Sequence, residues 1–322
     1  MKNPVLNVKN KIFGKLLFTN YLPLITSILF VLLLLTNPVN SISLVNSGLT
    51  TWYKNMIPAL FPFMVLSGFL LRCGLSNQIA QVLYPLLGRI FRLSPACVYV
   101  IIMGFMCGFP MGANVIADSL SLGKITKKEA DLLLSFCNNI GPIYFVSFAT
   151  VSCPFYPLWI TMTIMYGIPL IYGLFLRYTR YRDISYTYCC NQKKYISSGY
   201  LESFQESLQK ALISIVMLGG YMVIFNVLQL PFYNSFYQLP EKTLCIMKGL
   251  IEINSGITAI SAFPELYVIV YSVFLPFCGL CCLFQTYAMI KDTPLSLKKY
   301  LFHKIIQTVC VLFLYILLLN VR

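Results

Sequence analysis

The chain has 322 residues, of which 58% are hydrophobic and only 11% are charged, and its formal net charge is +14. Soluble domains carry about 25% charged residues, so this composition excludes a soluble protein and predicts one all-α polytopic membrane domain over residues 1–322. The basic residues gather between apolar segments, which is typical of cytoplasmic loops and argues against a nucleic-acid partner.

The first apolar segment covers residues 16–36 and follows four lysines between Lys2 and Lys15. It is longer than the apolar core of a signal peptide, and no small-residue cleavage site follows it. We therefore expect an uncleaved first span with the amino terminus in the cytoplasm.

Further apolar segments follow in chain order, separated by basic clusters. They cover residues 55–72, 95–122, 131–151, 154–176, 211–230, 243–263, 266–290 and 305–320. If every basic cluster is cytoplasmic, two of these segments must begin and end on the same side of the membrane. The charge pattern thus predicts about seven transmembrane helices and two re-entrant hairpins, with the side of the carboxyl terminus its weakest part.

The first predicted hairpin is the segment 95–122, which lies between Arg92 and Lys124. Because both ends are basic, the segment must enter the membrane and turn back. The sequence GFPMG at residues 108–112 supplies a glycine–proline breaker between two arms of about 12 residues, as a re-entrant segment needs.

The second predicted hairpin is the segment 243–263, which begins and ends outside and carries the breaker INSG at residues 253–256. Hairpins that enter from opposite faces are typical of an inverted repeat in a secondary transporter. We place the first repeat at about 54–176 and the second at about 207–304, with flanking spans at 16–36 and 305–320.

The span after each hairpin is interrupted by polar and helix-breaking residues. These residues are Asn138, Asn139, Gly141 and Pro142 in the first repeat and Pro276, Gly279 and Gln285 in the second. Broken backbone inside a membrane is tolerated where it is buried in protein or lines a watery cavity. The two hairpin tips and the two breaks are therefore predicted to meet at one site. Interhelical packing through the two asparagines is the alternative.

Ionisable residues near the tips are candidates for coupling. Asp118 follows the first tip and Glu252 precedes the second, and either could take a proton or help to bind a cation. The alternatives are that Asp118 borders the loop before Lys124 and that Glu252 forms a structural ion pair with Lys248, four residues earlier on the same helical face.

The sequences GFPMGANVIADSL, KKEADLLLSFCNNIGPIYFVSF, GLIEINSGI and FCGLCCLFQ together resemble the sporulation integral membrane protein YlbJ family, also called stage V sporulation protein V. That family is grouped with nucleoside-recognition Gate domains and is similar in plan to concentrative nucleoside transporters. The resemblance implies transport of dipicolinic acid across the mother-cell-derived outer forespore membrane during sporulation, and a homotrimer.

One departure from the family pattern concerns charge, because Asn114 stands where a lysine usually follows GxPxGA. An anionic substrate would then be held by half-helix amino termini and amides, with Phe109, Tyr144, Phe145 or Phe277 stacking on its ring. The predicted substrate-binding residues are Gly108, Phe109, Pro110, Gly112, Asn114, Asn138, Asn139, Gly141, Pro142, Glu252, Asn254, Ser255 and Gln285.

Other functions stay open at this point. The same broken helices would suit a carrier of nucleosides or other small polar solutes, and polar spans that only lock helices together would suit a non-transporting sporulation scaffold. We expect no enzyme activity, because the spans show no catalytic dyad or paired aspartates. We also expect no cofactor and no metal, since Cys278 and Cys281 have no second pair. The expected partners are a small anionic substrate, the lipid bilayer and other copies of the chain.

Overall fold

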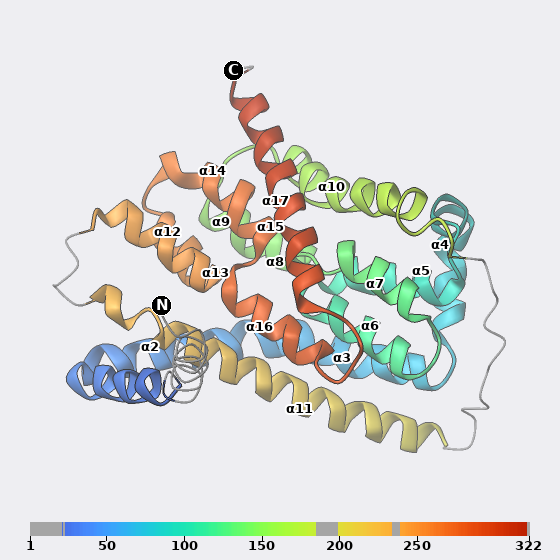
Figure 1. Cartoon of the computed structure of the whole chain (residues 1–322), viewed down its shortest axis with the longest axis horizontal. Helices are drawn as coiled ribbons and strands as arrows, with labels where there is room; N and C mark the ends of the chain where they lie inside the picture. The colour runs from blue at the N-terminus through green and yellow to red at the C-terminus, as the bar shows by residue number, and fades with distance from the viewer. Residues whose placement is uncertain (1–20, 22, 185–198, 234–238, 321–322) are drawn as a thin grey trace, which may run out of the picture.

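The described part of the chain is built from helices and contains no strand, as Figure 1 shows for the computed structural model. The structure describes residues 21, 23–184, 199–233 and 239–320. The predicted all-α fold is confirmed. The predicted first span lies partly outside the described residues, and its described part is helical over Pro23–Thr36.

Two helical runs extend beyond the apolar segments that the sequence predicts. α2 (Pro38–Thr51) passes through one π-helical turn, Trp52–Met56, into α3 (Ile57–Arg72). α11 (Tyr200–Val227) begins well before the predicted span 211–230 and continues into it. The amphipathic start of α11 consists largely of Leu, Glu, Gln, Lys and Ala, which are good helix formers, so nothing ends the helix before its apolar part.

The described residues contain five helices that are long and apolar enough to cross a membrane. They are Pro38–Arg72, Leu158–Tyr178 (α10), Tyr200–Phe232, Pro264–Ile290 and Leu297–Asn320 (α17). α4 (Ser76–Phe91) and α5 (Pro95–Cys107) meet at 103° and would together make a sixth. Two predicted crossings do not reach this length: residues 16–36 are only partly described, and residues 131–151 are divided by a break.

Both segments that the charge pattern assigned to hairpins fold as pairs of helices that pack against each other. In the first repeat α5 is followed by α6 (Met111–Ser121), and in the second α12 (Glu241–Ile251) is followed by α13 (Ile253–Ile260). Local caps support α5, since the Ser94 hydroxyl accepts a hydrogen bond from the Cys97 amide at 3.4 Å. The re-entry of the two pairs into a bilayer stays a prediction.

A broken span follows each hairpin. In the first repeat α7 (Lys127–Phe136) ends before a non-helical segment, and the helix resumes as the run 142–152, made of α8 (Pro142–Tyr144), a π-helical turn and α9 (Thr150–Ser152). In the second repeat α14 (Tyr267–Ile269), a π-helical turn and α15 (Leu275–Phe277) lead to α16 (Gly279–Ile290).

The second break lies at Cys278, which is held at φ = 72°, and Gly279 follows it at φ = 73°. Two successive residues in the left-handed region end α15 and redirect the chain into α16.

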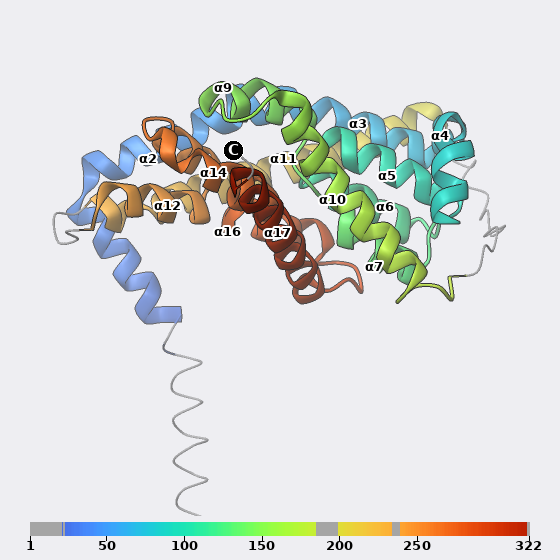
Figure 2. The same cartoon turned by 90° about the horizontal axis from the view of Figure 1, so that it is seen from above.

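The long helices enclose the hairpins and the broken spans. α11 lies alongside α2 and α3, and Figure 1 shows these helices along the lower side of the molecule. Both views place α2 and α12 toward one end of the molecule and α4 and α5 at the other (Figures 1 and 2). α17 packs against α7, α10, α15 and α16, and so closes the interior from another side. Buried apolar residues form one large cluster around α5, α6 and α7 and a second around the run 142–152 and the second hairpin.

The turn between α6 and α7 is tied to the end of α3. The Lys124 ammonium donates hydrogen bonds to the Leu71 carbonyl and, at 3.4 Å, to the Ser76 hydroxyl. Burial lowers the pKa of Lys124 to about 8. Thr126 and Glu129 form a reciprocal capping box that starts α7 directly after this turn.

Candidate functional site

The tip of the first hairpin is a tight turn that only glycine can form. Gly108 adopts φ = 79°, and a Cβ placed on it would lie 2.2 Å from the Gly141 nitrogen. A Cβ on Gly112 would likewise lie 2.3 Å from the Cys137 carbonyl oxygen. Both glycines therefore let the backbone of the tip touch the backbone of the first break, residues 137–141.

Two hydrogen bonds hold this tip on the break. The Phe109 amide donates to the Asn139 carbonyl at 2.5 Å, and the Ala113 amide donates to Asn138 Oδ1 at 3.2 Å. The amino-terminal end of α6 thus uses a side chain of the next span as its cap, in place of a residue of its own.

The Asn138 and Asn139 side chains point into the protein and away from solvent, with at most 1% of either residue exposed. Asn138 Nδ2 donates to the Thr286 and Tyr300 hydroxyls, each at 3.0 Å. Asn139 Nδ2 donates to the Phe136 carbonyl at 2.6 Å, and its Oδ1 accepts from Lys304 Nζ at 2.8 Å. The two asparagines therefore connect the first break to α16 and α17.

The second tip is organised by Glu252, which is 2% exposed. The carboxylate accepts hydrogen bonds from the Asn254 amide at 3.1 Å, from Asn254 Nδ2 at 2.7 Å and from the Ser255 amide at 2.8 Å. These contacts make Glu252 the cap of α13, where the partial positive charge of the helix end favours an anion. The break therefore lies at Glu252, one residue before the predicted INSG breaker, because those four residues already belong to the capped helix.

Small residues bring the two arms of the second hairpin together. A Cβ on Gly256 of α13 would lie 2.0 Å from the Gly249 Cα of α12, and a Cβ on Gly249 would lie 2.1 Å from the Phe274 ring. A Cβ on Gly279, at the second break, would lie 3.2 Å from the Gly249 carbonyl oxygen. Each hairpin thus packs on the break of the span that follows it in the sequence.

The two repeats meet at Tyr144 and Asn254. The Tyr144 hydroxyl, just after the first break, donates to Asn254 Oδ1 at the second tip over 2.7 Å. Asn254 is thereby held from both sides, by Tyr144 and by Glu252. Ser255 Oγ also lies 3.0 Å from Asn226 Oδ1, so the second tip contacts α11 as well.

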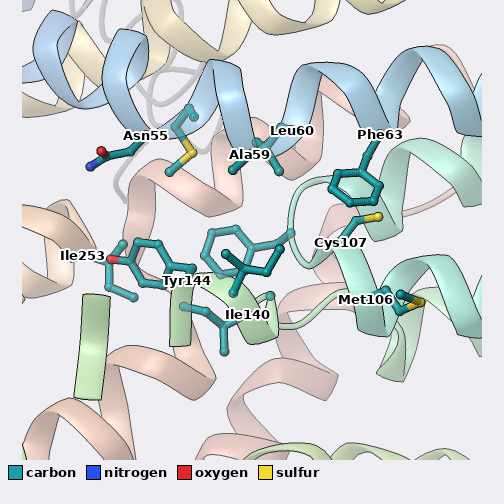
Figure 3. Close-up of a pocket in the computed structure, with 13 residues that line it drawn as sticks. Asn55, Ala59, Leu60, Phe63, Met106, Cys107, Ile140, Tyr144 and Ile253 are labelled. Atoms are coloured by element: carbon teal, nitrogen blue, oxygen red, sulfur yellow. The ribbon is translucent and has the colours of Figure 1, made fainter. Parts of the chain in front are cut away.

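A cavity of about 60 Å³ lies at this meeting point, bounded by α3, the first tip, the first break and the second tip (Figure 3). Its polar lining comes from Asn55 and Tyr144, and the rest is largely apolar. The residues around it are Asn55, Met56, Ala59, Leu60, Phe63, Met106, Cys107, Phe109, Ile140, Gly141, Ile143, Tyr144 and Ile253. The cavity opens to the surface beside Met106 and Ile143, each 59% exposed. An engineered cavity of about 150 Å³ holds one benzene, so this cavity is too small for an aromatic ring in the present structure.

The predicted site residues divide into three groups. Phe109 and Gly141 line the cavity, and Asn254 holds the Tyr144 hydroxyl beside it. Backbone turns and caps form the second group, which consists of Gly108, Pro110, Gly112, Pro142, Glu252 and Ser255. Asn114, Asn138, Asn139 and Gln285 form the third and are buried in the interior without lining the cavity.

Two further candidates lie away from the cavity. Asp118 follows the first tip on a later turn of α6 and forms an ion pair with Lys210 of α11, so its coupling role stays a prediction. Phe145 does not face the cavity, because it packs edge-on against Tyr166 and Tyr271 with 0% of its surface exposed.

Sequence reasoning missed Lys304, which stands among the basic residues that flank the last span. The structure buries it to 2% exposure on α17, against the Asn139 side chain. The signal in the sequence was its position directly before an apolar segment and next to the polar pair His303 and Gln307, on a helix that also carries Tyr300.

Comparison with known proteins supports the resemblance that the motifs indicated. The chain is 23% identical over 317 residues to the sporulation integral membrane protein YlbJ of Bacillus subtilis (strain 168), and the match covers 85% of this chain and 76% of that protein. No family model matches the chain. No solved structure matches it significantly. The nucleoside-recognition grouping therefore stays a prediction.

Proposed function

We propose that this chain transports dipicolinic acid by alternating access. The chain is similar to YlbJ over most of its length and carries several apolar helices of membrane length. The observation that carries the proposal is the convergence of two hairpin tips and a broken span on one cavity, joined by the Tyr144–Asn254 hydrogen bond. By resemblance to the sporulation family, the carrier would act in the outer forespore membrane as a homo-oligomer. The lysines before the first span favour a cytoplasmic amino terminus.

The chemistry of the cavity supports an aromatic substrate. Phe109 and Tyr144 offer ring faces, and the Tyr144 hydroxyl offers a donor once it leaves Asn254. The helical run 142–152 begins at the cavity with Gly141 and Ile143 among the lining residues, so its positive amino-terminal end faces the space that a carboxylate would enter.

The small size of the cavity supports a mechanism with moving tips. The contacts that hold the tips against the first break and against each other are a small number of hydrogen bonds and glycine-mediated backbone contacts, which can open without breaking a hydrophobic core. Outward movement of one tip and then of the other would expose the cavity to each side in turn. Glu252, although buried, is used as a cap, so proton coupling through it remains a separate prediction.

The test is uptake into liposomes that contain the purified full-length protein. Terbium enclosed in the liposomes reports dipicolinate entry by its luminescence, and radiolabelled uridine tests the nucleoside alternative. We expect saturable dipicolinate uptake that empty liposomes lack. Uptake of uridine without dipicolinate would overturn the proposed substrate, and uptake of neither would favour a scaffold.

A matched pair of variants connects uptake to the cavity. Ala59 lines the cavity, so Ala59→Phe should fill it and abolish uptake. Val151 is 72% exposed on the outer surface, so Val151→Phe adds a ring without touching the cavity and should leave uptake unchanged. Equal uptake by both variants would show that the cavity is not on the transport path.

A further inference from the structure

We propose that Lys304 and the Asn138–Asn139 break form an anion site that receives a carboxylate of the transported molecule. This inference rests on the proposed transport function, and it names the residue that binds the negative charge of the substrate. It starts from the position of Lys304, whose ammonium group is buried inside a membrane protein and donates to a neutral amide oxygen, Asn139 Oδ1, at 2.8 Å.

No side-chain carboxylate neutralises this lysine. All ten Asp and Glu residues of the chain lie in its described part, and their ion pairs there are with other basic residues. The nearest pair along α17 joins Lys299 to Asp131 at 3.3 Å, on the exposed side of the helix. A buried cation without a counter-ion costs free energy, and such residues inside membranes usually serve a function.

The surroundings of Lys304 offer donors that an anion can use. The Phe109 amide, the Ala113 amide and the Lys304 ammonium all donate to oxygen atoms of the Asn138–Asn139 pair. These acceptors are neutral. A carboxylate would be the stronger acceptor for the same donors, because hydrogen bonds to an ionised group are charge-assisted. In the closed state the asparagine oxygens therefore occupy the places that a substrate carboxylate would take.

The site is also next to the cavity. Ile140 and Gly141 line the cavity, and Asn139 directly precedes them in the same non-helical segment. The first tip covers this segment through contacts of Gly108 and Gly112. When that tip lifts from the break, the amides of Phe109 and Ala113 are released and the lysine becomes reachable from the cavity. The positive charge that Asn114 does not provide is thus supplied from α17.

The experiment measures ligand-induced thermal stabilisation of the purified full-length protein. The probes are dipicolinate, a panel of other small aromatic carboxylates, and the neutral diamide of dipicolinic acid. Wild type should be stabilised by carboxylates and not by the diamide. Because a hydrogen bond between charged groups is worth a factor of about 10 to 100 in affinity, Lys304→Met should raise the Kd of the stabilising carboxylate by about that factor.

Controls separate charge recognition from folding. Lys298→Met removes an exposed lysine of the same helix and should keep the wild-type Kd. Asn139→Asp places a fixed carboxylate beside the Lys304 ammonium. This variant should show no rise in melting temperature with ligand, whether or not the variant without ligand melts at the wild-type temperature. If Lys304 were only structural, Lys304→Met would lower the melting temperature and leave the Kd of the folded fraction unchanged.

The outcomes distinguish this inference from the proposed function. Dipicolinate uptake with an unchanged Kd in Lys304→Met would overturn the anion site and leave the transport function standing. Stabilisation by other carboxylates that depends on Lys304, without dipicolinate uptake, would overturn the substrate and keep the anion site. Stabilisation by the diamide as strong as that by dipicolinate would overturn the anion site in wild type itself.

Discussion

Replacing Glu252 with glutamine tests the organisation of the second hairpin. The carboxylate accepts three N–H hydrogen bonds, two on Oε1 and one on Oε2. Glutamine has one acceptor oxygen, so its NH₂ group must face at least one of these donors. A lost hydrogen bond to a charged group costs about 1.5–3 kcal/mol, and we expect the free energy of unfolding to fall by at least that amount.

The assay is thermal unfolding in detergent, followed by a thiol-reactive dye that reports the exposure of buried cysteines. The matched control is Glu265→Gln, because Glu265 is half exposed and pairs with Lys242 at the surface. Such an exposed pair contributes little to stability, because solvent screens the two charges. If Glu252→Gln melts at the same temperature as Glu265→Gln, the carboxylate is not the cap of α13. That result would instead favour a Glu252 that works in its protonated form, which glutamine mimics.

Three further predictions concern the first hairpin and the contact between repeats. Tyr144→Phe leaves Asn254 Oδ1 without the Tyr144 hydroxyl as donor, which should destabilise the contact between the two repeats by about 1–3 kcal/mol. Cysteines placed in the cavity should then be labelled faster. Unchanged labelling would show that this hydrogen bond does not limit access to the cavity. Gly108→Ala should lower the melting temperature of the protein far more than Gly123→Ala. Both glycines have positive φ, but only Gly108 has backbone atoms within 3 Å of the position of an added Cβ. Equal melting temperatures would argue against contact between the first tip and the first break. Lys124 has a pKa of about 8 in the folded protein and a usual value of 10.5, so the unfolded chain binds more protons between these two pH values. The free energy of unfolding should therefore rise with pH over this range. Lys124→Met should remove this pH dependence from the melting temperature.

Much of the fold could be predicted from charge and apolar length. Arg92 and Lys124 flank the first hairpin, and this pattern alone indicated that the segment turns back, which the α5–α6 pair is consistent with. The glycines and prolines at residues 108–112 and 141–142 also marked the turn and the break correctly, because few other residues allow such backbone.

Side-chain directions at the breaks could not be predicted. A helix has a period that assigns each residue to a face, whereas residues 137–141 have none, so the sequence could not show that Asn138 and Asn139 point toward α16 and α17. Pairings between distant segments were hidden for a related reason. Asp118 pairs with Lys210, 92 residues away, and only the packing of α6 near α11 brings them together.

Lys304 shows how a rule that holds for most of the chain can hide one residue. Lysines beside apolar segments usually mark the cytoplasmic surface, and Lys298 and Lys299 on the same helix are exposed, as that rule expects. Lys304 lies more than one turn further along α17, where it is 2% exposed and contacts Asn139 of the first break.

A structure of the protein with dipicolinate bound tests the central claim most directly. We predict ligand density between the two hairpin tips, with the ring against Tyr144 or Phe109 and one carboxylate within hydrogen-bond distance of Lys304 Nζ. Dipicolinate bound elsewhere on the protein, with the tips still closed on an empty cavity, would contradict this prediction.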